Sequence, residues 1–228
     1  IKNFATNFFE VIMKRLILLF FLLPSQVFAF VYPPKYVYEG FLRNNKQVHS
    51  ITYTKVYQSI SEGRSAQVDR VEKVFIERPG KVRIFDEKNM VDKRMNPTKA
   101  ILMQQNQKRE ISIDSIMSPI EMLWAYDQVD PLMIRINQFQ TPTHKYQWFL
   151  YQGKKHWMQG TRDGDFILFT EDTFNLKAAK KGDFIYQFQY PADSTSISSF
   201  PNRIIVFKNQ KPFEEILIQN VQFNTRIP

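Results

Sequence analysis

Apolar and polar residues alternate along most of the chain after His49, which is the pattern of β-strands that bury one face. In SITYTKVYQSI (50–60), Ile, Thr, Tyr and Val recur with a period of two residues. Several later segments share this pattern or are rich in β-branched and aromatic residues. They are QVDRVEKVFIE (67–77), KVRIFDE (81–87), KAILMQQNQKREISID (99–114), KYQWFLYQGKKHWMQGT (145–161), DGDFILFTEDTF (163–174), KKGDFIYQFQYP (180–191) and PNRIIVFKNQKPFEEILIQNVQF (201–223). Polar turns at Gln105–Gln107, Arg162–Asp165 and Asn209–Pro212 divide the longer segments into antiparallel strands.

One segment near the middle of the chain has the pattern of a helix start. Ser118 is placed to cap the first free amide groups, Pro119 suits the first helical position, and Glu121 completes a capping box. Met117 and Met122 have the spacing of a hydrophobic staple. The apolar residues that share one face of this helix are Ile120, Leu123 and Trp124.

Two other helical segments are less clearly marked. A second short helix is predicted to begin at Asp130-Pro131, and YVYEGFLRNNKQV (36–48) fits either a short helix or coil. Many strands interrupted by helix near the middle predict a mainly β (α+β) fold. We therefore expect a curved antiparallel sheet or open barrel with helical cover, and not alternating βαβ units.

The first residues have the order of a secretory signal peptide. Met13-Lys14-Arg15 is a short positive region, and LILLFFLL (16–23) is an apolar run. Val27-Phe28-Ala29 is similar to the small-x-small pattern that precedes a signal-peptide cleavage site. We expect translation to start at Met13 and cleavage to follow Ala29. The apolar run is too short to span a bilayer core of about 30 Å. Residues 1–29 are therefore predicted to be upstream residues plus signal peptide, and 30–228 to be a single periplasmic domain.

The net charge and the cysteine content of the chain limit the classes of partner that it is expected to bind. The chain carries a net charge of +9 and has no cysteine, so it has neither a disulfide nor a thiol for a lipid anchor. We expect a soluble exported protein that is held together by its core. In that compartment a basic surface favours anionic lipid surfaces or acidic proteins over nucleic acid. The same charge is equally consistent with a contribution to solubility alone.

The sequence contains few candidates for catalytic or metal-binding residues. The three histidines, His49, His144 and His156, lack the spacing of metal ligands, and no Gly-x-Ser-x-Gly motif or phosphate-binding glycine loop is present. Glu214-Glu215 is a carboxylate pair, but it lies in a predicted hairpin where at least one side chain faces solvent. We therefore expect no enzyme, no metal and no cofactor.

Aromatic residues are abundant, with 21 Phe, 10 Tyr and 3 Trp. Several strand segments are apolar on both faces, namely WFLY (148–151), FILF (166–169) and RIIVF (203–207). A sheet that is covered on one side alternates more cleanly. These strands are therefore either covered on both sides in a filled core, or they line a cavity.

The hairpin VEKVFIERPGKVRIFD (71–86) resembles the Arg-Pro hairpin of the LolA-like family, the periplasmic carriers of outer-membrane lipoproteins. In that family a short helix precedes a strand like SITYTKVYQ (50–58), and the next strand ends in Arg-Pro. EEILIQNVQFNTRIP (214–228) is similar to the late family strand in which an Asn follows an aromatic-containing stretch. Members of the family continue beyond this strand, which leaves open a truncation at the C-terminus.

The resemblance implies an unclosed antiparallel β-barrel, or half-barrel, with short covering helices around an apolar cavity. It also implies a non-catalytic carrier that binds the acyl chains of lipoproteins and shuttles them from the inner to the outer membrane. The implied partners are acylated lipoproteins or lipid, an inner-membrane release complex and an outer-membrane acceptor, with the carrier a monomer. The alternative on this fold is a periplasmic lipid-sensing or regulatory module. A hydrolase and a structural envelope protein with a filled barrel are further rivals.

Arg78 matches the Arg-Pro of the family, and the resemblance implies that it gates the cavity by donating hydrogen bonds to a covering helix. If a two-residue Pro-Gly loop joins the strands, Val74 faces Phe85 and Ile76 faces Arg83. Those four residues and Arg78 then share the cavity face, and Arg83 is a rim charge, while Phe75, Val82 and Ile84 lie on the other face. The candidate covering helix is the one at 117–124. The predicted lipid-binding and gating residues are Arg78, Val74, Ile76, Phe85, Met122, Leu123 and Trp124.

Overall fold

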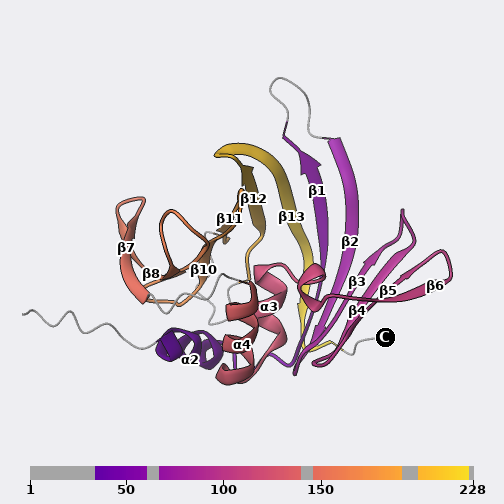
Figure 1. Ribbon diagram of the computed structural model, residues 1–228, viewed down its shortest axis with the longest axis horizontal. Coiled ribbons are helices and arrows are strands. Elements are labelled where there is room, and N and C mark those ends of the chain that lie inside the picture. The colour runs from indigo at the N-terminus through magenta and orange to yellow at the C-terminus, as the bar shows by residue number, and fades with distance from the viewer. Residues whose placement is uncertain (1–33, 61–66, 140–145, 192–199, 226–228) are drawn as a thin grey trace, which may run out of the picture. The chain divides into compact units, whose positions relative to one another are not determined.

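The computed structural model describes residues 34–60, 67–139, 146–191 and 200–225. They belong to one unit, Tyr32–Pro228, in which helices pack on one face of a large antiparallel sheet (Figure 1). The predicted signal peptide lies outside the described residues. None of the described helices combines the length and the apolar character that crossing a bilayer requires.

The described part of the chain begins with a helix and continues with two groups of strands, which are separated by three further helices. The helices are α2 (Pro34–Asn44), the 3-10 helix η1 (Ile113–Ser115), α3 (Pro119–Ala125) and α4 (Val129–Phe139). The strands are β1 (Ser50–Ser59), β2 (Gln67–Glu77), β3 (Lys81–Asp86), β4 (Val91–Met95), β5 (Ala100–Gln104), β6 (Gln107–Ile111), β7 (Tyr146–Tyr151), β8 (Lys154–Gly160), β9 (Phe166–Thr170), β10 (Leu176–Lys181), β11 (Phe184–Gln189), β12 (Arg203–Lys208) and β13 (Lys211–Phe223).

Neighbouring strands of the sheet are antiparallel, in the order β6-β5-β4-β3-β2-β1-β13-β12-β11-β10-β9-β8-β7. The sheet thus consists of two meanders, β1–β6 and β7–β13, which join where β1 pairs with β13. Its edges are β6 and β7, and among the described strands these two are not paired with each other. The predicted mainly β fold, an open half-barrel with short helices, is confirmed.

The connection between the two edge strands carries α3 and α4 across the inner face, by which we mean the face of the sheet that the helices cover (Figure 1). There α3 contacts β2 and β3 of the first meander. On the second meander, the Tyr38 hydroxyl of α2 donates a hydrogen bond to Gln159 of β8, and the Tyr38 ring packs edge-on against Phe169 of β9. The helices therefore cover the inner face of both meanders.

The helix start predicted around Ser118 is confirmed. α3 begins at Pro119, and the backbone N–H of Ser118 donates to the carboxylate of Glu121 with an N···O distance of 2.9 Å, as part of a capping box. All the residues of α3 are buried. A helix with no solvated face must find partners inside the protein for the free polar groups at both of its ends.

The pattern of the sequence failed to predict β4 and β10. Their sequences, VDKRM (91–95) and LKAAKK (176–181), are rich in charged residues and alanine, which are depleted in strands. Both strands have a paired neighbour on each side. The ladder hydrogen bonds to these neighbours satisfy the backbone, and tertiary context therefore overrides local propensity.

The β2–β3 hairpin differs from the prediction by one residue. Glu77 pairs with Lys81, so that three residues, Arg78, Pro79 and Gly80, form the loop where two were expected. Gly80 has φ +72°, a left-handed conformation that glycine adopts without the steric cost of a Cβ atom.

A shift of one residue in a strand turns each of its side chains to the opposite face. Val82 and Ile84 therefore lie buried on the inner face, where the prediction placed Phe85. Phe85 lies instead on the outer face together with Arg83. The predicted positions of these two residues on the cavity face are wrong.

Candidate functional site

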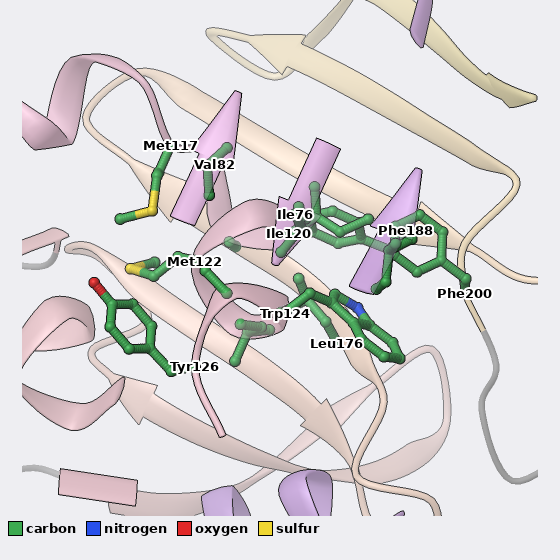
Figure 2. Close-up of a cluster of buried hydrophobic side chains, with 14 of the residues drawn as sticks. Ile76, Val82, Met117, Ile120, Met122, Trp124, Tyr126, Leu176, Phe188 and Phe200 are labelled. Atoms are coloured by element: carbon green, nitrogen blue, oxygen red, sulfur yellow. The ribbon is translucent and has the colours of Figure 1, made fainter. Parts of the chain in front are cut away.

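The inner face of β2 and the buried helix α3 meet in an apolar contact. Val74 and Ile76 of β2 belong to the same buried cluster as Met122, Leu123 and Trp124 of α3. Figure 2 shows part of this cluster, with Ile76 of the sheet beside side chains of α3. The structure thus brings these predicted residues together, and α3 occupies the face that was predicted to line a cavity.

Trp124 packs among aromatic rings from three other parts of the chain. The centroid of its ring lies 5.3 Å from that of Phe41 in α2, 5.2 Å from that of Phe200 and 6.2 Å from that of Phe223 in β13. The planes of these rings are tilted or nearly perpendicular, which is a preferred geometry of aromatic pairs. Trp124 therefore fixes α3 against both α2 and the second meander.

Arg78 stands at the end of β2 and donates three hydrogen bonds to backbone carbonyls. Its Nε donates to the carbonyl of Trp124 at 3.0 Å, and its Nη1 donates to the carbonyls of Asn45 and Val48, each at 2.9 Å. The guanidinium also lies over the Trp124 ring, 5.6 Å from the centroid. Arg78 thereby ties the sheet to α3 and to the segment between α2 and β1. The expected bond to a covering helix is present, and its gating role stays a prediction.

The environment of Arg78 holds a cation without a bonded carboxylate. In the described part of the chain its hydrogen-bond acceptors are carbonyls, and its Nη2 atom is buried with no hydrogen-bond partner. Burial lowers the pKa of the guanidinium to about 10, against an opposing contribution from Asp127, so the group stays charged at neutral pH. A cation whose hydrogen bonds go to neutral carbonyl groups is bound less strongly than one whose hydrogen bonds go to a carboxylate.

The same loop also satisfies the C-terminal end of α3. The N–H of Gly80 donates to the carbonyl of Ala125 with an N···O distance of 2.6 Å, next to the bond between Arg78 and Trp124. The last carbonyls of a helix have no partner within the helix and need outside donors when they are buried. Residues 78–80 supply two such donors, and they fasten this end of α3 to the sheet.

Arg83, the second arginine of the hairpin, has a different environment on the outer face. Its Nε and Nη2 each lie 3.1 Å from an oxygen of Asp92, in a bidentate pair. Its guanidinium lies within cation–π distance of the rings of Phe75 and Phe85. Phe85 therefore belongs to this outer-face group and not to the cluster beneath α3.

A buried ion pair fastens the N-terminal half of α3. The Nζ atom of Lys55 in β1 lies 2.5 Å from Oε1 of Glu121, and the two side chains are 3% and 0% exposed. The hydroxyl of Tyr53 donates to the same carboxylate oxygen. Polar contacts to the sheet therefore hold α3 at both ends, inside a cluster that is otherwise apolar.

Sequence reasoning missed this ion pair, because it assigned Glu121 a role only in helix capping. A signal was nevertheless present in ITYTKVY (51–57). Lys55 has the same parity as Ile51, Tyr53 and Tyr57, all of which are buried, so a lysine occupies an inward position of an amphipathic strand. A buried lysine requires an anionic partner, but the identity of that partner depends on the tertiary fold.

Each charge of the pair stabilises the other. Burial by itself raises the pKa of a carboxyl, but the charge of Lys55 and the hydrogen bonds from Lys55, Ser118 and Tyr53 together outweigh burial and hold the pKa of Glu121 below its ordinary value. Burial likewise acts to lower the pKa of Lys55, but Glu121, with smaller contributions from Tyr57 and Glu72, outweighs burial and raises that pKa. The polar network continues along β1, where the hydroxyl of Tyr57 donates to Glu72 at 2.6 Å.

The pair should make the stability of the protein depend on pH. Because the pKa of Glu121 is lowered on folding, its contribution is present above its ordinary pKa of 4.5 and is lost as pH falls through the folded pKa. Because the pKa of Lys55 is raised, its contribution is lost only at strongly alkaline pH. We expect the free energy of unfolding of the wild type to fall more between about pH 6 and pH 3 than that of the double variant Lys55→Met/Glu121→Met. Urea denaturation at both pH values measures the difference, and equal losses would contradict the expectation.

The described residues contain no group of three or more His, Cys, Asp or Glu side chains that is arranged to hold a metal ion. What they do offer is a buried helix over an apolar sheet face, fastened by Arg78 at one end and by Glu121 at the other.

Comparisons with known proteins identify the fold. No family model matches the sequence, and no curated protein matches it at a significant level. Among solved structures, a LolA superfamily protein from Nitrosomonas europaea is similar, with a TM-score of 0.54, 8% identity, and coverage of 85% of this chain and 94% of that one. A DUF1329 family protein from Desulfovibrio piger is also similar, with a TM-score of 0.54, 12% identity, and coverage of 86% and 95%. At these identities the likeness shows the fold alone, and the expected LolA-like fold is confirmed.

Proposed function

We propose that this chain uses its LolA-like fold to carry acyl chains of lipoproteins or lipid on the sheet face that α3 covers, after α3 moves away from the sheet. The observation that carries the proposal is the hydrogen bond of Arg78, which lies at the end of β2 and donates to the carbonyl of Trp124 in the wholly buried helix α3. Such a fastening keeps an apolar surface closed when it is empty and can be undone without breaking a covalent bond. The proposed function is therefore transport and not catalysis.

The physical need for such a carrier follows from the cost of exposing acyl chains to water. Each CH₂ group exposed to water costs about 0.8 kcal/mol, so a chain of roughly 14 carbons costs on the order of 11 kcal/mol. The cluster beneath α3 supplies a surface that is apolar enough to replace water around such a chain. In the structure α3 covers this surface itself, so we interpret the arrangement as the closed, empty state.

Opening would replace contacts of α3 by contacts of the ligand. A ligand shifts such an equilibrium only by its differential affinity for the two states. The bond from Arg78 to the carbonyl of Trp124 therefore sets part of the threshold that an acyl chain has to overcome, and it favours release of the chain once an acceptor is available. In this proposal Arg78 acts as a latch.

The wider setting of the proposal follows the predicted export signal and the basic charge of the chain. We place the carrier in the periplasm, where it would receive acylated lipoproteins from an inner-membrane release complex and pass them to an outer-membrane acceptor. The alternative, a lipid-sensing module, predicts a different outcome. A sensor would bind a lipopeptide without passing it to vesicles, and would crosslink to an inner-membrane protein.

We expect Arg78→Leu to slow the release of a bound ligand about tenfold. Of the three hydrogen bonds that the variant loses, the one to Trp124 joins Arg78 to α3, and its loss destabilises the closed state relative to the open state by roughly 1.4 kcal/mol. The purified protein is loaded with the apolar dye N-phenylnaphthylamine or with a dipalmitoylated lipopeptide. It is then mixed with excess phosphatidylcholine vesicles, and transfer is followed by fluorescence. The bound fraction before mixing should rise in the same variant.

The same hairpin supplies a matched control in Arg83→Leu. Arg83 is paired with Asp92 on the outer face, so removing it should leave the release rate unchanged. Urea denaturation of both variants separates an effect on release from an effect on folding. If Arg78→Leu has wild-type stability and releases its ligand at the wild-type rate, Arg78 is not a latch.

A further inference from the structure

The two carboxylate oxygens of Glu121 are bound by different parts of the protein. Oε1 lies against Lys55 and accepts from the hydroxyl of Tyr53, and both of these residues belong to strand β1 of the sheet. Oε2 accepts from the backbone N–H and from the hydroxyl of Ser118, which is the N-cap of α3 itself. One oxygen therefore faces the sheet, and the other is held within the helix.

This division determines what happens to each group if α3 leaves the sheet. Glu121 moves with the helix and keeps the two donors of Ser118, and in the open state its charge is also free to be hydrated. Lys55 and Tyr53 stay on β1, and both lose their common acceptor. A cation and a hydroxyl donor then converge on the position that Oε1 occupied, at the base of an apolar surface.

We propose that the ligand of this protein carries an acidic group next to its acyl chain, and that this group replaces Oε1 of Glu121 between Lys55 and Tyr53. In the closed state Glu121 thus acts as a tethered substitute for the acidic group of the ligand. The proposal rests on the carrier function above and names its ligand class. That class is an amphiphile with a carboxylate or a phosphate, and not a neutral lipid.

Two shallow hollows lie on the inner face next to the strand position of the ion pair, although Lys55 and Tyr53 themselves do not line them. Glu72 lies opposite Lys55 in the ladder between β1 and β2, and it lines a hollow of about 360 Å³ together with Arg70 and Lys93. An adjacent hollow of about 450 Å³ shares Lys93 and adds Arg109. The acids of the first hollow already have partners, since Glu72 accepts from Tyr57 and Asp86 accepts from Asn89. Arg70 lies 3.4 Å from Glu72 and pairs with it, which leaves Lys93 and Arg109 against Asp86, and this excess of cations favours an anionic headgroup over a neutral one.

The experiment compares amphiphiles that differ only in charge. Displacement of N-phenylnaphthylamine from the purified protein at neutral pH gives the affinities for dodecanoate and dodecanol. A second comparison uses dioctanoylphosphatidate and dioctanoylglycerol. We expect the charged member of at least one pair to bind about tenfold more tightly, and the pair that shows the preference identifies a carboxylate or a phosphate as the acidic group.

Three variants test the assignment to Lys55 and Glu121. Glu121→Gln removes the internal competitor and should tighten binding of the charged amphiphile several-fold. Lys55→Met/Glu121→Met removes both charges together and should bind the charged and neutral members equally. Lys99→Met removes an exposed lysine and should keep the wild-type preference, which excludes an effect of net charge alone.

A purely structural ion pair gives a different pattern. Glu121→Gln would then weaken or leave unchanged the binding of both members of each pair, and the double variant would keep whatever preference the wild type has. Equal wild-type affinity for charged and neutral members in both comparisons overturns this inference and leaves the carrier function standing. Failure of the dye and of all four amphiphiles to bind overturns both.

Discussion

Replacing Lys55 by methionine is expected to lower the free energy of unfolding by about 3–5 kcal/mol, because the variant leaves Glu121 as a buried carboxylate without its cation. Glu121 is fully buried, and its remaining partners, Tyr53 and Ser118, are neutral donors. Methionine has a length close to that of lysine and fills the same space, so the loss reports on charge more than on packing. Denaturation in urea at neutral pH measures it.

The double variant Lys55→Met/Glu121→Met serves as the control. Replacement of a whole buried ion pair by apolar residues of similar volume is often neutral or stabilising, so we expect a free energy of unfolding within about 1 kcal/mol of the wild type. The strong coupling between the two positions is the signature of a direct pair. Additive losses from the two single substitutions would show that the charges do not interact as the structure describes.

Trp124→Ala is expected to cost about 3–5 kcal/mol of stability, because it removes the largest side chain of α3 from a fully packed site. The ring is 3% exposed and contacts Phe41, Phe200 and Phe223. The backbone carbonyl that accepts from Arg78 is still present in the variant. The substitution therefore separates the contribution of packing from that of the latch.

Trp148→Ala is the matched control on the edge strand β7. Trp148 is 36% exposed and stacks on Trp157, so its removal should cost only about 1 kcal/mol. Thermal or urea denaturation of the two tryptophan variants, side by side, tests the expected order. A loss for Trp124→Ala no greater than that for Trp148→Ala would mean that α3 is not packed against the sheet.

The sequence was sufficient to predict those helices, strands and turns whose sequence patterns span only a few neighbouring residues. The capping box of Ser118 and Glu121 and the proline at the first helical position mark the start of α3. The alternation in residues 50–60 likewise matches β1, and the turn at Arg162–Asp165 lies between β8 and β9 as expected. In these cases the hydrogen-bonding partners are neighbours in the sequence, so the pattern contains the whole interaction.

Features that depend on distant residues could not be predicted in the same way. The loop of the β2–β3 hairpin has one residue more than a Pro-Gly pair implies, and this one residue moved Phe85 to the outer face. The acceptors of Arg78 include the carbonyls of Asn45 and Val48, and every residue has a carbonyl, so no sequence pattern marks them. The partner of Lys55 lies in a helix that the fold alone brings to β1.

The pairing of β1 with β13 has a consequence for the order in which the chain can fold. Ile51 pairs with Phe223, so the seam between the two meanders joins residues that are synthesised far apart in time. Until β13 is available, β1 has β2 as its only neighbour among the described strands, and the second meander is not joined to the first. Contacts of such large sequence separation form slowly. Completion of the native sheet therefore waits for the residues of β13, and the first meander is exposed along β1 until they arrive.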